Sequence, residues 1–379
     1  MNILRQCLSV CRFSLLGLPH RRLSALVIVV GMGCVVGVLL AMLSVAAGLL
    51  RANSAGDPRL VLVLPQSQAL SPAAVATILD APGIARDADG KPLADGELWV
   101  QIPPAEGFVE GSLGVQGIGP AGLKMRSQFQ LASGRMYRAG LHELLMGAAG
   151  SRKFHLQIGD AVIMPDGDWR IVGIFTEGGG PLESRLLADR DTLMASLHTD
   201  SVGNVLLQPE NPAAYGELKQ WLTSNPSLTV NAQTQAEYFL SQISGSARFF
   251  TIMAYTVGAM LATGAVFGAV NIMYGAVTTR TREIGTLRSM GYDAVPIAVS
   301  VLLEAILLSL LGGTLGAGAA WFTCNGQLNM NGTAIFENYV SARLFAIGIG
   351  WAVLLGLLGA LFPAIRAARL TIVDALHVT

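Results

Sequence analysis

The sequence predicts an α-helical membrane protein with four transmembrane helices and one large α/β domain between the first and second helices. Two observations support this prediction. Only 13% of the 379 residues are charged, which is about half the share that is typical of soluble domains. The hydrophobic residues make up 52% of the chain and gather in four long runs. Each run is longer than the roughly 20 residues that cross a bilayer as a helix.

The four apolar runs occupy residues 23–50, 249–277, 295–322 and 344–365. The run at 295–322 contains one acid, Glu304, and the other three contain no charged side chain. The first run exceeds the roughly 7–15 apolar residues of a cleavable signal peptide. We therefore expect it to remain in the membrane as the first span.

The basic residues outside the runs predict the orientation. The lead at 1–22, the loop at 278–294 and the tail at 366–379 together hold nine basic and three acidic residues. The positive-inside rule places all three segments in the cytoplasm. The long segment 51–248 and the short loop 323–343 then lie on the other side of the membrane.

The lead at 1–22 has two interpretations. Leu4, Cys7, Leu8, Cys11 and Leu15 recur with helical spacing, which is typical of an amphipathic helix on the inner membrane surface. A basic leader that only fixes the orientation fits the same residues equally well.

The segment 51–248 has mixed α/β character. It predicts two strand–helix–strand units, one at each end: 59–65, 72–80 and 98–103, then 204–209, 212–224 and 228–232. Two such units suggest one α/β subdomain split by an insert. The insert, about 111–187, is β-rich: Asp166-Gly167 is typical of a hairpin turn. A glycine run can bind phosphate when a helix N-terminus and usually a lysine follow it. The glycines at 178–180 are followed by Pro181, Leu182, Glu183 and Ser184, which match this pattern poorly. We therefore expect these glycines to form a loop.

The sequence lacks the common catalytic and metal-binding motifs. It has no GxxxxGK[ST], HExxH, CxxC or GxSxG pattern, and none of the four cysteines lies in 51–248. Equal numbers of acidic and basic residues, 25 of each, give no support for nucleic-acid binding. We expect no metal or catalytic site, and any energy source must come from a partner protein.

Several motifs in the last third carry a resemblance to a known family. Residues 279–293 read TRTREIGTLRSMGYD, Glu304-Ala305 follows in the next span, and 311–316 read LGGTLG. Residues 363–370 read PAIRAARL, and 373–376 read VDAL. This pattern over 249–379 resembles the permease domain of the FtsX/MacB superfamily of ABC transporters. Thr371-Ile372 stands where that family often has proline. Residues 117–177 also resemble the periplasmic core domain of MacB-type members.

The resemblance implies a type VII, mechanotransmission permease in the bacterial inner membrane. Segment 51–248 would be periplasmic, with a porter-like α/β part and a β-rich part, and both termini would be cytoplasmic. The permease would work as a dimer with a second copy or a paralogue. Each chain would pair with a separate cytoplasmic ABC ATPase that binds ATP and Mg²⁺, while this chain binds no cofactor and is not an enzyme.

The resemblance also assigns candidate functional residues. The loop 278–294 would be the coupling helix that docks into the ATPase, with these contacts: Arg280, Arg282, Glu283, Ile284, Leu287 and Arg288. Glu304 is an acid inside a span, where ionisable groups are costly; we expect it to be a protonated or paired acid that holds helices together. Three GxxxG motifs would allow close helix packing: Gly33 with Gly37, Gly264 with Gly268, and Gly312 with Gly316.

The favoured function is export of periplasmic cargo through an adaptor and an outer-membrane duct. Three alternatives stay open at the level of sequence. One is extraction of lipoproteins or lipids from the membrane, as in the LolC/LolE branch. Another is FtsX-like signalling to a cell-wall hydrolase. The last is a membrane-anchored enzyme whose active site lies in 51–248.

Overall fold

The structure is a computed structural model that describes residues 22–370, except 54–55, 67–68, 103–112 and 333. The amphipathic lead predicted before the first span and the last residues of the tail lie outside the described residues. The chain forms two compact units. The membrane unit comprises Met1–Ala47, Arg248–Gln327 and Asn338–Thr379, and the outer unit comprises Gly48–Ala247 and Leu328–Glu337.

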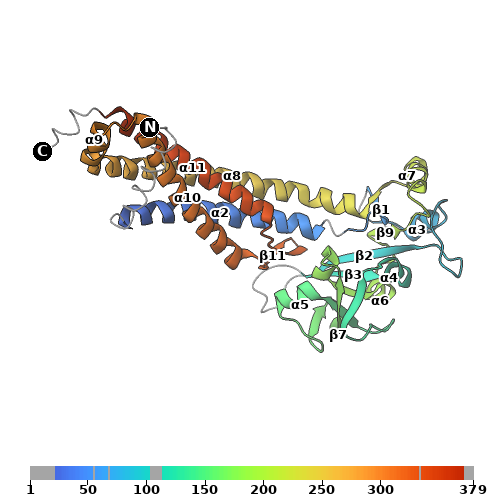
Figure 1. The fold of residues 1–379 in the computed structure, drawn as a ribbon. Coiled ribbons are helices and arrows are strands. Elements are labelled where there is room, and N and C mark those ends of the chain that lie inside the picture. The colour runs from blue at the N-terminus through green and yellow to red at the C-terminus, as the bar shows by residue number, and fades with distance from the viewer. Residues whose placement is uncertain (1–21, 54–55, 67–68, 103–112, 333, 371–379) are drawn as a thin grey trace. The chain divides into compact units, whose positions relative to one another are not determined.

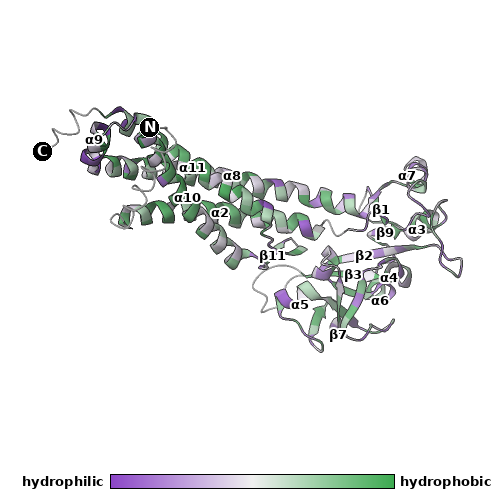
Figure 2. Ribbon diagram, viewed as in Figure 1, coloured by the Kyte–Doolittle hydropathy of each residue, from purple (hydrophilic) through white to green (hydrophobic). Residues whose placement is uncertain are grey.

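The described part of the chain has four helices long and apolar enough to cross a membrane, which confirms the predicted four spans. They are α2 (Arg22–Asn53), α8 (Gln235–Thr279), α10 (Ala294–Cys324) and α11 (Ala342–Arg369). A short helix, α9 (Thr281–Ser289), connects α8 to α10. Figure 2 shows the contrast between the hydrophobic long helices and the largely hydrophilic α9.

Glycines set the distance between α2 and α10. A Cβ added to Gly33 would lie 3.1 Å from the carbonyl oxygen of Gly312, and one added to Gly37 would lie 3.3 Å from that of Gly316. A Cβ on Gly316 would overlap the carbonyl oxygen of Gly33. Two of the GxxxG motifs therefore pack against each other within this chain. The third is different: a Cβ on Gly264 or Gly268 would meet no described atom within 4 Å.

The described residues of Gly48–Ala247 in the outer unit form one ten-stranded mixed sheet in the order β10-β1-β9-β2-β3-β8-β5-β7-β4, with β6 paired to β7. The strands are β1 (Val61–Pro65), β2 (Ala94–Ile102), β3 (Leu113–Ile118), β4 (Phe129–Gly134), β5 (Glu143–Gly147), β6 (Ala161–Met164), β7 (Gly167–Glu177), β8 (Leu186–Asp189), β9 (Asn204–Leu207) and β10 (Val230–Thr234). The connecting helices are α3 (Pro72–Leu79), α4 (Pro120–Met125), α5 (Ala148–Phe154), α6 (Arg190–Ser196), α7 (Ala214–Ser224) and the 3₁₀ turn η2 (Pro181–Ser184).

The two predicted strand–helix–strand units meet in this sheet, because β1 lies between β10 and β9, and β2 follows β9. The prediction of one split α/β subdomain is confirmed. Ser71 caps α3 as its sequence predicts, accepting a hydrogen bond from the Ala74 amide. Leu218 and Leu222 of α7 belong to the buried core that also holds Ile78 of α3.

The β-rich insert continues the same sheet. The first half of β2 pairs with β9 and its second half pairs with β3, so β2 joins the insert to the split subdomain. The predicted hairpin at Asp166-Gly167 is confirmed: β6 pairs with β7 from Met164 opposite Gly167. The predicted glycine loop is present as well, with Gly178 and Gly179 at φ values of 61° and 78°.

Candidate functional site

Helix α9 is short and is stabilised at both ends by charge. Glu283 lies in its first turn and Arg288 in its last turn, an arrangement that favours the helix dipole at each end. Gly291, at φ 88°, ends the turn that follows the helix. This turn returns the chain to α10 within a few residues.

Arg280 and Glu304 form an ion pair inside the membrane unit. The Nη1 atom of Arg280 lies 2.9 Å from Oε2 of Glu304, and their side chains are 14% and 7% exposed. Arg280 stands at the junction of α8 and α9, and Glu304 lies in α10. The pair therefore ties this junction to the third span, in line with the paired role expected for Glu304.

One face of α9 is turned into the membrane unit. Ile284 is 6% exposed and belongs to a buried cluster that also contains Val277, Ile297 and Ala364. Ile284 is expected to dock into a partner, and in this structure the spans of the chain itself cover its side chain. Ile284 anchors α9 to α8, α10 and α11.

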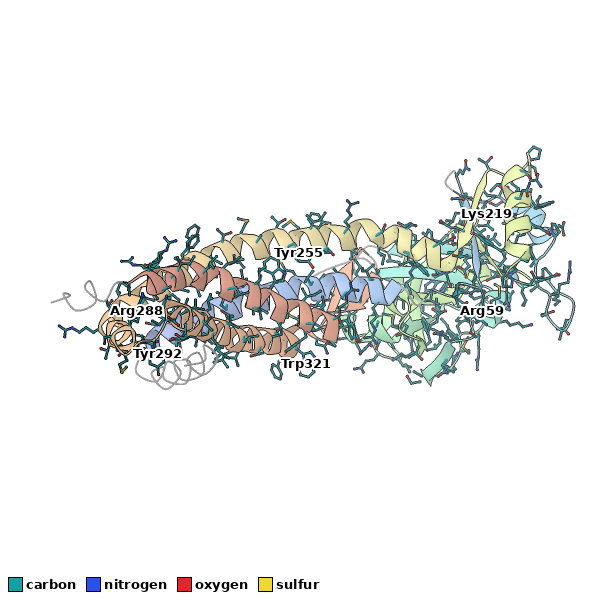
Figure 3. The ribbon with its side chains drawn as sticks, turned by 45° about the horizontal axis from the view of Figure 1, so that its top comes forward. Arg59, Lys219, Tyr255, Arg288, Tyr292 and Trp321 are labelled. Atoms are coloured by element: carbon teal, nitrogen blue, oxygen red, sulfur yellow. The ribbon has the colours of Figure 1, made fainter. Side chains whose placement is uncertain are left out.

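Arg288 connects α9 to the end of α11. Its Nη1 atom donates to the carbonyl oxygens of Ala368 and Leu370 at 2.9 and 2.8 Å. These are among the carbonyls that a helix leaves without internal partners at its C-terminus. Arg288 thus caps α11 and is only partly available to a second protein (Figure 3).

The other face of α9 is open. Arg282, Glu283, Thr286 and Ser289 are exposed, Leu287 is half-buried, and Met290 is 62% exposed. The six predicted coupling residues therefore divide into three that hold α9 in place and three that lie on or beside its open face. Met290, which is not among the six predicted coupling residues, adds an apolar side chain to this face. We call Arg282, Glu283, Thr286 and Met290 the open face of α9.

The loop between α10 and α11 is a β-hairpin that belongs to the outer unit. The sequence predicts only a short loop for 323–343, but in the structure β11 (Leu328–Asn331) pairs with β12 (Ala334–Glu337). The Ser184 hydroxyl donates to the Ile335 carbonyl at 3.1 Å and accepts from the Ile335 amide at 2.9 Å. Arg152 pairs with Glu337 at 2.9 Å. These contacts fasten β12 to α5 and η2, and the Lys153 Nζ of α5 donates to the Leu328 carbonyl of β11 at 3.3 Å.

The hairpin changes how the two units are connected. The chain passes between them four times: after Ala47, after Ala247, after Gln327 and after Glu337. Every span is therefore joined covalently to a segment that is built into the outer unit.

Two family models match the chain. The FtsX-like permease C-terminal model matches residues 255–372, and the MacB-like periplasmic core domain model matches residues 23–225, more than half of the chain. The chain belongs to the FtsX/MacB family of ABC transporter permeases. The predicted resemblance is confirmed.

Several relatives of this permease are known by name. It is 27% identical to the uncharacterized ABC transporter permease YknZ of Bacillus subtilis, over 58% of this chain and 57% of YknZ. It is 24% identical to the macrolide export ATP-binding/permease protein MacB of Bdellovibrio bacteriovorus, over 58% of this chain and 36% of that protein. The MacB of Escherichia coli is 28% identical over 42% of this permease and 25% of MacB. The matched stretch is thus little more than half of YknZ and a smaller part of each MacB.

Two solved structures are similar to the permease. The extracellular domain of YknZ from Gram-positive bacteria gives a TM-score of 0.35 at 11% identity, covering 46% of this chain and 100% of that structure. The periplasmic region of MacB from Actinobacillus actinomycetemcomitans gives a TM-score of 0.37 at 11% identity, covering 50% and 94%.

Proposed function

We propose that this permease couples ATP hydrolysis by a separate cytoplasmic ATPase to movement of its periplasmic outer unit, and so drives export of periplasmic cargo. The observation that carries the proposal is the division of α9 into a fixed face and an open face. A helix that is fastened to α8, α10 and α11 transmits a push on its open face to three spans at once. A flexible loop would absorb the same push.

The orientation is part of the proposal. Arg288 joins α9 to the end of α11, and Arg366 of α11 lies over the Tyr274 ring of α8 at 5.3 Å. These basic segments share one end of the membrane unit (Figure 1). The positive-inside rule favours the cytoplasm for that end. The ATPase, with its ATP and Mg²⁺, would dock there as a separate subunit, because the sequence has no P-loop.

The hairpin of β11 and β12 would transmit movement of the spans to the outer unit. Movement of α10 and α11 would reach the outer unit through β11 and β12, whose contacts include both Ser184 hydrogen bonds. Movement of α2 and α8 would reach it directly, since both helices continue beyond the membrane unit. Glu304 is the one charged residue in the four apolar runs and is paired with Arg280, which favours transmission of force over a polar path for cargo.

Co-purification tests the proposal. The tagged chain, purified from its native membrane in mild detergent, is expected to bring a P-loop ATPase, a second permease chain and a periplasmic adaptor, identified by mass spectrometry. The double variant Glu283→Arg/Met290→Glu should lose the ATPase, because it reverses the charge and polarity of the open face. Glu217→Arg, an equally exposed change on α7 of the outer unit, should keep it.

The same experiment separates the alternatives. An ATPase with a second permease and no adaptor would favour lipoprotein release, and an ATPase with a hydrolase activator would favour signalling. Recovery of no ATPase, in a preparation that retains known complexes, would contradict the proposal. Full retention of the ATPase by the double variant would contradict docking at α9.

A further inference from the structure

The outer unit contains a cavity of ≈ 580 Å³, which is within the size range of small-molecule sites. One part of its lining is apolar and comes from Leu60, Leu62, Trp99 and Tyr238. Another part is a wall of charged and amide side chains: Glu97, Gln116, Arg126, Glu177 and Arg185. An apolar lining with a few convergent polar groups is typical of ligand sites.

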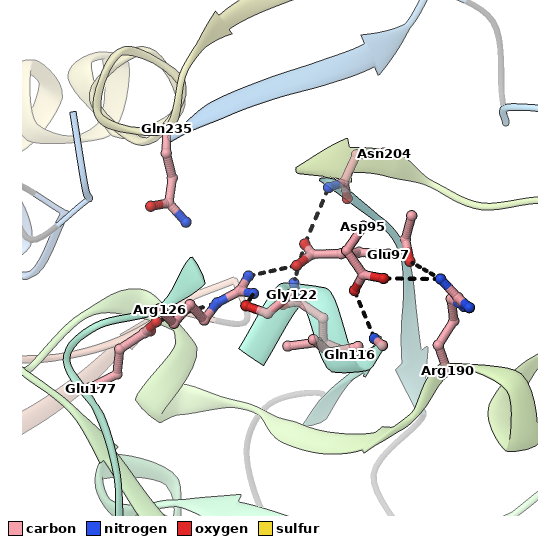
Figure 4. Close-up of polar contacts among 12 residues, drawn as sticks. Asp95, Glu97, Gln116, Gly122, Arg126, Glu177, Arg190, Asn204 and Gln235 are labelled. Carbon is pink, nitrogen blue, oxygen red and sulfur yellow. Dashed lines mark hydrogen bonds and ion pairs between the residues drawn. The ribbon is translucent and has the colours of Figure 1, made fainter. Parts of the chain in front are cut away.

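The carboxylate of Glu97 is fully engaged by its neighbours. Its Oε1 accepts from Arg126 at 2.6 Å, and its Oε2 accepts from Gln116 at 2.8 Å and from Asn204 at 3.2 Å (Figure 4). Glu97 is 1% exposed. Its negative charge is therefore neutralised within the wall, and its oxygens have little capacity left for a ligand.

Arg185 is in the opposite situation. Its Nη1 atom donates to the neutral Oε1 of Gln116 at 2.7 Å, and its guanidinium lies 5.8 Å from the centre of the Trp99 ring. No carboxylate oxygen among the described residues lies within the 4.0 Å of an ion pair with it. Burial lowers the pKa of Arg185, as expected for a cation removed from water without an anionic partner. A guanidinium has five N–H donors, so most of these remain for a ligand.

Glu177 determines the net charge of the wall. Burial raises its pKa to about 7, although Arg126 lies 3.3 Å away and opposes the shift. The other charged groups that act on it are Glu97, Glu183 and Arg185. Below pH 7 Glu177 is mostly protonated, and the wall then carries Arg126 and Arg185 against the one charge of Glu97. Asp57, elsewhere in the lining, is paired with Arg59 at 2.8 Å. The cavity is thus electrostatically suited to an anion, increasingly so as the pH falls.

We propose that this cavity binds a small amphiphilic carboxylate, with the carboxylate group on Arg185 and the apolar body on the leucine and aromatic side chains. Arg185 provides a charge-assisted and geometrically specific contact for such a group. Trp99 and Tyr238 offer flat apolar surfaces to the rest of the molecule. The inference concerns the outer unit alone and does not depend on ATPase coupling.

The test is equilibrium dialysis of 2-naphthoate against the full chain in lipid nanodiscs, with empty nanodiscs as the correction for lipid partition. We expect 2-naphthoate to bind and its neutral isostere 2-naphthamide to bind at least about tenfold more weakly, as a charged hydrogen-bonded contact predicts. Arg185→Gln should weaken 2-naphthoate by about the same factor and Arg185→Lys by less. Arg170→Gln, an exposed arginine outside the cavity, should have no effect.

The pH gives an independent readout. Affinity for 2-naphthoate should rise from pH 8 to pH 6, because Glu177 becomes neutral over this range while the probe stays ionised. Equal binding of the carboxylate and the amide by the unaltered chain would overturn the proposal, and this result does not depend on any variant folding. Unchanged affinity in a folded Arg185→Gln variant, or a preference for 2-naphthylmethylammonium, would also overturn it.

Discussion

Replacing Gly316 with alanine is expected to destabilise the membrane unit by about 2–3 kcal/mol, the upper part of the range for overpacking. The new Cβ would overlap the backbone carbonyl oxygen of Gly33. A backbone atom cannot rotate away as a side chain can, so α2 and α10 would have to separate. Thermal unfolding of the purified chain in one detergent should show Tm lower by roughly 4–10 °C.

The matched control for this prediction is Gly318→Ala in the same helix. Gly318 is exposed, and a Cβ there would meet nothing within 4 Å of the described atoms. That variant should be as stable as the unaltered chain, or slightly more so, because alanine is the better helix former. Equal stability of the two variants would show that α2 and α10 do not pack through Gly316 and Gly33.

Removing one member of the Arg280–Glu304 pair is expected to cost about 3–5 kcal/mol, because the remaining charge stays buried and loses the ion pair that offsets its burial. Arg280→Ala and Glu304→Ala should each lower Tm and the yield of folded protein. The double variant Arg280→Met/Glu304→Leu should regain most of the stability, since a buried pair and a well-packed apolar pair are often nearly equal. Arg59→Ala, which breaks an exposed ion pair with Asp57, should lower Tm far less than either single variant, because solvent-exposed ion pairs contribute little to stability.

The double variant also separates stability from coupling. It should fold, but the junction of α8 and α9 would no longer be joined to α10 by a directional contact. In the complex with its ATPase, we therefore expect the outer unit to respond less to nucleotide, measured by limited proteolysis with and without ATP. A double variant as unstable as either single variant would contradict the pairing, and a fully nucleotide-responsive double variant would contradict its role in coupling.

The sequence predicted the four spans because uncharged runs of this length have few alternatives in water. It also predicted the strands and helices at both ends of the outer unit, where Ser71 and the hairpin at Asp166-Gly167 are strong local signals. It missed the hairpin of β11 and β12. Four-residue strands carry little periodicity, although the Asn-Gly pair at 331–332 is a common turn signal in a sequence and lies at the end of β11. The hydrogen bonds that hold this hairpin come from Ser184, which is far away in the sequence.

The two faces of α9 show a second limit of prediction from the sequence. The family motif identified its residues but did not say which of them face the spans. Helical spacing contained part of that information, since Arg280, Ile284 and Arg288 recur every four residues and lie on one face. Neither spacing nor motif indicated the cavity in the outer unit, because Trp99, Gln116 and Arg185 come from separate segments that only the sheet brings together.

The most direct measurement is photo-crosslinking from the open face of α9. A benzophenone side chain placed at Met290 is compared with one at Phe267, an exposed residue of α8, in native membranes. We predict an ultraviolet-dependent adduct between the Met290 derivative and a P-loop ATPase, identified by mass spectrometry, and no such adduct from Phe267. Failure of the Met290 derivative to capture any ATPase, in membranes where the complex is shown to assemble, would contradict the assignment of α9 as the coupling element.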